Sequence, residues 1–118
     1  RYPFGIEFNE VLERVKASFG EDNVTVDHHK EIIYNDPNSP LVKTLLEVYQ
    51  THTGDYDSKP FSIGGGTFAR AMPNVVAFGA HFLNTPSNIH QPEESIDLND
   101  LIKATIIYTE ALYRLATQ

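Results

Sequence analysis

His90 is the residue whose type and surroundings best suit catalytic chemistry in this sequence. It lies in the polar segment Ile89–Glu94, with Glu93 and Glu94 close behind it. Imidazole nitrogens near carboxylates are common metal ligands. One histidine is not a site, however, since a catalytic zinc normally takes three protein ligands. His90 is therefore a candidate ligand, and the alternative is an ordinary surface histidine just before a helix.

None of the other four of the five histidines is predicted to be a metal ligand, and His28 and His29 are expected to be structural or solvent-exposed. His28 and His29 are adjacent, so on a strand their side chains would face opposite sides and could not hold one ion together. His52 is expected beside the last carbonyls of a helix, and His81 is expected to be packed behind an apolar run. The sequence has no cysteine, so thiolate ligands, disulfides and cysteine nucleophiles are excluded.

The run Gly64–Gly66, followed by Thr67 and Arg70, is the second candidate. Glycines leave the backbone N–H groups open to close approach, so the run could bind an anion. The spacing is not that of a P-loop, because no Lys-Ser/Thr pair follows. A tight turn beside a surface arginine explains the same residues equally well.

The charge balance narrows the classes of partner. The chain has 118 residues, with 9 Lys plus Arg against 16 Asp plus Glu, and a net charge of −7. This balance argues against nucleic acid as a general partner, because phosphate binding requires a basic face. No stretch approaches the roughly 20 apolar residues of a membrane span. The absence of cysteine fits a reducing compartment, and the predicted location is cytoplasmic.

Helical spacing of apolar residues predicts three helices. The first spans 8–19 and stops at Gly20. The second begins after Ser39, with Pro40 at the first helical position, and stops at Gly54. The third begins near Asp97, which can cap it. Its expected apolar face consists of Leu98, Leu101, Ile102, Ile106, Leu112 and Leu115.

Strands are predicted between these helices. Residues 1–3 are interpreted as a strand end, residues 23–29 alternate as a half-buried strand does, and residues 61–63 form a short strand. The nearly all-apolar run 74–80 is typical of a strand covered on both faces. The alternation predicts an α/β (α+β) fold with a domain boundary near the turn cluster 35–40.

Four segments resemble the M20 metallopeptidase family, in particular its dipeptidase V-type, Xaa-His (carnosinase-like) members. They are Arg1-Tyr2-Pro3, Ser39-Pro40-Leu41-Val42, the glycine–arginine segment Gly64–Gly79 and His90-Gln91-Pro92-Glu93-Glu94. They occur in the family's order and span almost the whole chain. Two positions depart from the family pattern: Glu93 replaces the usual asparagine, and Phe68 replaces a more usual tyrosine.

This resemblance implies a domain organisation. Residues 1–31 would be the second half of a ferredoxin-like lid domain, and residues 32–118 the C-terminal part of a zinc-exopeptidase α/β catalytic domain. The chain begins with Arg1 rather than Met, and it is expected to be an internal fragment. Its partners would be a dipeptide substrate and the N-terminal part of the same enzyme.

The resemblance also implies a chemistry, in which two zinc ions per full-length enzyme activate a water that hydrolyses a dipeptide. His90 would ligate one zinc, and Arg1 would bind the terminal carboxylate of the substrate. Gly64, Gly65 and Gly66 would line the substrate pocket. The general base and the other ligands would lie outside this chain, so the fragment is expected to be inactive.

Alternative functions stay open on the sequence alone. The chain could be a stand-alone α/β binding or regulatory module that holds a small anion at Gly64–Gly66. Within the enzyme interpretation, a deacylase or aminoacylase relative is possible. Truncated sheets would leave open strand edges, which tend to pair with a second copy, so a homo-oligomer of the fragment is also expected.

Overall fold

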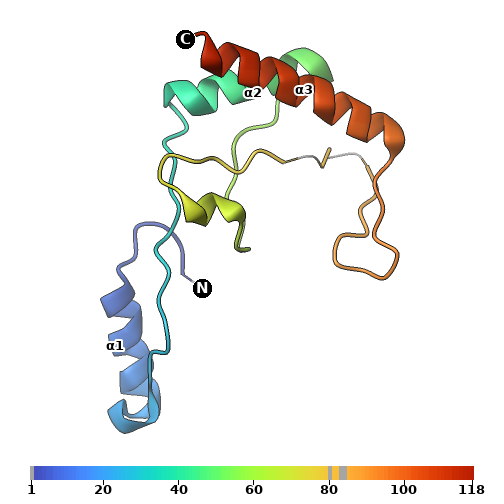
Figure 1. Ribbon diagram of the computed structural model, residues 1–118. Coiled ribbons are helices and arrows are strands. Elements are labelled where there is room, and N and C mark those ends of the chain that lie inside the picture. The colour runs from blue at the N-terminus through green and yellow to red at the C-terminus, as the bar shows by residue number, and fades with distance from the viewer. Residues whose placement is uncertain (1, 80, 83–84) are drawn as a thin grey trace. The chain divides into compact units, whose positions relative to one another are not determined.

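The computed structural model describes residues 2–79, 81–82 and 85–118 (Figure 1). Its α-helices are α1 (Phe8–Phe19), α2 (Pro40–Thr53) and α3 (Leu98–Ala116), and two short 3-10 helices are η1 (Glu21–Asn23) and η2 (Phe68–Ala71). The chain divides into two compact units, Arg1–Tyr34 and Asn35–Gln118. The assignment of residues 1–31 and 32–118 to two enzyme domains stays a prediction.

The three predicted helices are confirmed, and their ends follow the expected signals. Ser39 Oγ accepts a hydrogen bond from the Val42 N–H at 3.3 Å, and Gly54 closes α2 in the left-handed conformation with φ +71°. The Asp97 carboxylate accepts from the N–H groups of Asn99 and Asp100 at 2.7 and 3.4 Å. Such caps satisfy terminal N–H groups that the helix itself leaves unpaired.

The predicted strands, and with them the α/β (α+β) fold and its ferredoxin-like lid, are wrong for this structure. The described residues contain helices but no strand, including those within 23–29, 61–63 and 74–79. Residues 1 and 80, at the ends of two predicted strands, lie outside the described residues. A strand exists only through hydrogen bonds to a neighbouring strand, whereas an alternating sequence reports only a burial pattern. The open strand edges on which the expected oligomer rested are therefore missing from the described part of the chain.

Val24 illustrates this difference. Its dihedral angles are extended, with φ −119° and ψ 115°. Its N–H bonds Glu21 O at 3.3 Å instead of a strand partner. The local preference for an extended backbone is thus present at this position, while the long-range pairing is not.

The first unit is held by aromatic contacts and has little core. The rings of Phe8 and His29 stack with centroids 4.0 Å apart, and the Tyr2 hydroxyl lies 2.5 Å from His29 Nε2. Phe4 and Tyr34 stack at 3.9 Å. No residue of α1 is buried.

The core of the second unit lies between α2 and α3, which run side by side in Figure 1. It consists of Leu45, Val48, Ile107 and Ala111, of which Val48 is completely buried. Val76 and Phe78 pack against this cluster. The Tyr108 hydroxyl donates to Phe78 O at 3.2 Å. The apolar run 74–79 is therefore a segment packed on the helix pair rather than a strand.

Of the six residues in the apolar face predicted for α3, Leu115 packs against the α2–α3 core, whereas the other five lie on an exposed side. Leu98, Ile102, Ile106 and Leu112 are 50–70% exposed, and Leu101 is 46% exposed. The buried positions of α3 are Ala104, Ile107 and Ala111. Small alanine side chains allow the backbones of two helices to approach closely, so α2 packs on the face with the smaller residues.

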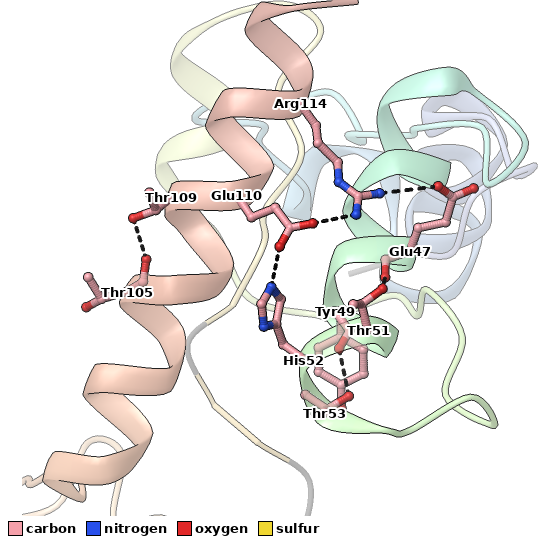
Figure 2. Close-up of polar contacts among 9 residues, drawn as sticks. All are labelled: Glu47, Tyr49, Thr51, His52, Thr53, Thr105, Thr109, Glu110 and Arg114. Carbon is pink, nitrogen blue, oxygen red and sulfur yellow. Dashed lines mark hydrogen bonds and ion pairs between the residues drawn. The ribbon is translucent and has the colours of Figure 1, made fainter.

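Polar side chains also join α2 to α3, as Figure 2 shows. His52 Nε2 lies 2.5 Å from Glu110 Oε2. Arg114 contacts the other oxygen of Glu110 and lies 3.8 Å from Glu47 Oε2. Beyond the drawn cluster, Gln118 Nε2 donates to the buried Thr44 Oγ1 at 2.7 Å. Hydrogen bonds from His52 and Arg114 hold the pKa of the Glu110 carboxyl below its usual value.

Acid is expected to weaken the pairing of α2 and α3 through Glu110. Its pKa is lower in the folded chain than in the unfolded chain, so the carboxylate stabilises the fold above its ordinary pKa of 4.5. This contribution is lost as the pH falls through the folded pKa. Melting followed by circular dichroism from pH 7 to pH 3 should show a smaller loss of Tm for Glu110→Gln than for wild type.

Glu47→Gln is the matched control, because the Glu47 side chain is 67% exposed and exposed ion pairs contribute little to stability. Its pH profile should follow wild type. Asp55 is present in all three proteins, and its pKa is lowered mainly by hydrogen bonds from Ser58. All three proteins should therefore lose some stability in acid. Identical pH profiles for wild type and Glu110→Gln would contradict the role of Glu110.

Candidate functional site

The loop that carries His90 is held in shape by its own hydrogen bonds. Asn88 is the central residue: its Nδ2 donates to Glu93 O at 2.9 Å, and its Oδ1 accepts from the Ser95 N–H at 3.0 Å. The Gln91 N–H bonds Asn88 O at 3.0 Å. An asparagine can bond backbone groups in this way because its amide both donates and accepts. The segment therefore has a defined backbone without belonging to a helix.

His90 itself presents an exposed side chain from a strained backbone position. Its φ is +63°, a left-handed conformation that residues other than glycine rarely adopt. The His90 N–H donates to Glu94 Oε2 at 3.1 Å. The carboxylate of Glu94 thus supports the loop backbone. An exposed imidazole on such a loop can bind a metal ion.

Glu93 occupies a second left-handed position, with φ +60°. Asparagine adopts this conformation several-fold more readily than glutamate. The asparagine that the family resemblance expects at position 93 would therefore fit the loop with less backbone strain. The departure at Glu93 changes the charge beside His90.

The described residues do not hold a metal ion by themselves. No group of three His, Asp or Glu side chains within residues 2–79, 81–82 and 85–118 is placed to bind one. His90 can supply one ligand, but the set that a catalytic zinc needs is not brought together in this part of the chain.

The Gly64–Gly66 segment leads into η2. Thr67 Oγ1 accepts from the Ala69 N–H at 3.2 Å, and the Arg70 N–H bonds Thr67 O at 3.2 Å. A Cβ added at Gly65 would meet no atom within 4 Å, and one added at Gly66 would lie 3.8 Å from Arg70 Nε. Neither residue has the positive φ that would require glycine. The fold of this chain therefore gives no reason for glycine at position 65.

Arg1, the predicted carboxylate-binding residue, lies outside the described residues. The other histidines are placed by the structure: His28 is exposed and His29 stacks on Phe8. The prediction for His52 missed its main partner, which is Glu110 of α3 and not a helix carbonyl. His81 is exposed, so its expected packing was wrong.

Sequence reasoning also missed the polar network after α2. The Tyr49 hydroxyl and the Ser58 hydroxyl both donate to Asp55 Oδ2, at 2.9 and 2.5 Å. Burial, followed by the hydrogen bond to Asp55, raises the pKa of Tyr49. An aspartate just after a helix-ending glycine is a signal for such a turn. The network fixes the chain where it leaves α2 and has no direct link to His90.

Among the described residues, no helix combines the length and the apolar character needed to cross a membrane. This finding leaves the predicted cytoplasmic location untested.

Similar proteins identify the family. The model of "Peptidase family M20/M25/M40" matches residues 5–114. A Staphylococcus epidermidis protein named "Putative dipeptidase" is 40% identical over 120 aligned positions, and the alignment covers the whole of this chain. Proteins with the same description from Staphylococcus haemolyticus and Staphylococcus saprophyticus are 39% and 38% identical, also over the whole chain.

The chain spans about a quarter of the length of these relatives, since the alignments cover 25% of each. The family match extends across both compact units and includes the glycine segment and the His90 loop. These matches bear out the resemblance seen in the four sequence segments. The chain belongs to peptidase family M20/M25/M40.

Proposed function

We propose that this chain is the C-terminal part of a zinc-dependent dipeptidase and that it supplies part of the substrate pocket and one metal ligand. The observation that carries the proposal is the 40% identity, over the whole chain, to a protein named "Putative dipeptidase". The substrate class is a dipeptide, and the remaining ligands and the general base belong to the rest of the enzyme.

His90 is the proposed metal ligand of this chain. Its exposed side chain and its hydrogen-bonded backbone support this role. A ligand contributes most to metal affinity when its position is fixed before the metal binds. No step of the reaction can be assigned to this chain alone.

The glycine segment and Arg1 are the proposed substrate contacts. Gly65 has open space around it and no backbone need for glycine. A requirement for glycine would then come from a group that approaches the backbone from outside, such as a bound dipeptide. Arg1 would add a guanidinium that can bind both oxygens of the substrate carboxylate.

The 118-residue chain alone is expected to show no dipeptide hydrolysis. It offers one proposed ligand, whereas catalysis by zinc needs a complete set. Incubation with zinc and an Xaa-His dipeptide, followed by detection of the released amine, should give the rate of a zinc-only blank. Turnover clearly above that blank would contradict the division of the site between this chain and the rest of the enzyme.

In the full-length enzyme, His90→Asn is expected to lower both zinc content and kcat. Asparagine tolerates the φ of +63° at this position, so the loop keeps its shape while the imidazole is lost. Elemental analysis should show less than full zinc occupancy, and kcat should fall by about 10-fold or more. His81→Asn removes another exposed imidazole and should change neither quantity. Full zinc occupancy with wild-type turnover in His90→Asn would contradict the assignment.

Alanine at Gly65 is expected to leave the fold intact and to impair substrate binding. In the 118-residue chain, Gly65→Ala should keep the wild-type Tm within about 1 °C, because the new methyl meets no neighbour. Gly54→Ala meets equally open space but must adopt φ +71°, which costs roughly 1 kcal/mol and several degrees of Tm.

In the full-length enzyme, the same Gly65→Ala change should lower kcat/KM for dipeptides. Unchanged kcat/KM would remove Gly65 from the substrate pocket. A drop in Tm of the 118-residue chain like that of Gly54→Ala would show instead that the fold itself requires this glycine.

A further inference from the structure

Helix α3 (Leu98–Ala116) carries a second apolar surface on the side turned away from the α2–α3 core. At 3.6 residues per turn, its members share a stripe of about 140°. We call this surface the outer stripe of α3; it consists of Leu98, Leu101, Ile102, Ile106, Leu112 and Tyr113, with Thr105 and Thr109 between them. All eight residues are exposed and none is charged.

The two threonines of the outer stripe do not make it polar. Thr105 Oγ1 donates to Leu101 O at 2.8 Å, and Thr109 Oγ1 donates to Thr105 O at 2.8 Å. Figure 2 shows both side chains on the side of α3 opposite the His52–Glu110 contact. Because each threonine hydroxyl proton is already bonded within the helix, covering the stripe would leave neither threonine donor unpaired.

Helix α2 differs from α3 in this respect. Its exposed positions include Lys43, Glu47 and Thr51, which follow one another at four-residue spacing and form a solvated face. The charged residues of α3 near its middle and end, Lys103, Glu110 and Arg114, all lie outside the outer stripe. A helix that is apolar on its inner and its outer side is typical of a helix buried on both.

We propose that the outer stripe of α3 packs against the part of the same polypeptide that lies outside this chain, so that α3 is an interior helix of the full-length enzyme. This inference rests on the proposal that the chain is part of a longer dipeptidase. The length of the relatives indicates what would cover the stripe, since this chain spans only 25% of their length and the remaining polypeptide could pack against it. An uncharged stripe along most of a helix fits a permanent interface, since transient interfaces carry more polar groups.

The test replaces the centre of the stripe with a charge. Ile106→Lys keeps a good helix former at an exposed position of this chain, so the 118-residue protein should melt as wild type does. In the full-length protein the same lysine would be buried against an apolar surface. Its Tm should fall by about 3 °C or more relative to wild type. Scanning calorimetry of both proteins gives the comparison.

Ile96→Lys is the matched control, because Ile96 is 51% exposed and Ile106 is 50% exposed, while Ile96 lies outside the stripe. It should leave the Tm of both proteins unchanged. If full-length Ile106→Lys does not fold, Ile106→Ala provides a milder change and should still lower the Tm. A wild-type Tm for both Ile106 variants in the full-length protein would overturn the proposal.

A second copy of the chain is the competing occupant, and sedimentation distinguishes it. The proposal is wrong if the stripe is a dimer interface. In that case both the 118-residue chain and the full-length protein form a discrete dimer, and Ile106→Lys dissociates it. The monomeric full-length variant then keeps the wild-type Tm. Activity separates this inference from the proposed function. A full-length protein that hydrolyses no dipeptide but still loses stability in Ile106→Lys would contradict only the function.

Discussion

The packing of α2 against α3 is the interaction on which the second unit depends. It buries Leu45, Val48, Ile107 and Ala111, and it fixes the two ends of the long connection between Gly54 and Asp97. Both candidate segments, Gly64–Gly66 and the loop around His90, lie within that connection. Their positions therefore follow from how the helix pair is anchored and from how Val76 and Phe78 hold the middle of the connection against it.

The helices could be predicted from the sequence because their determinants are local. Ser39 with Pro40, Gly54 and Asp97 each act on backbone groups within a few residues, so a short stretch of sequence contains the whole cause. The strands could not be predicted in the same way. Residues 23–29 and 74–80 have the composition of strands, but pairing needs a partner segment that no local pattern specifies.

The orientation of α3 and the candidate site show two further limits. Because α3 is apolar on two sides, its periodicity did not reveal which side faces α2. Of the predicted apolar residues, Leu115 packs against the core, whereas the other five are exposed. His90 and the glycine segment were singled out by residue type and by family resemblance, and the family is now established. What the sequence did not contain is a signal for the left-handed backbone at His90 and Glu93, or for the partner of His52, which lies 58 positions away.

The distance along the chain between α2 and α3 also sets the order in which the second unit can assemble. Thr44 and Gln118 are 74 positions apart, so a long loop must close before the contacts between α2 and α3 can form. During synthesis α2 leaves the ribosome well before α3. At a synthesis rate of about 5–20 residues per second, α3 is completed roughly 3–13 s after α2. The apolar side of α2 has no partner helix during that time. The caps at Ser39 and Gly54 are local and need no such partner, so they can form while the core is still missing.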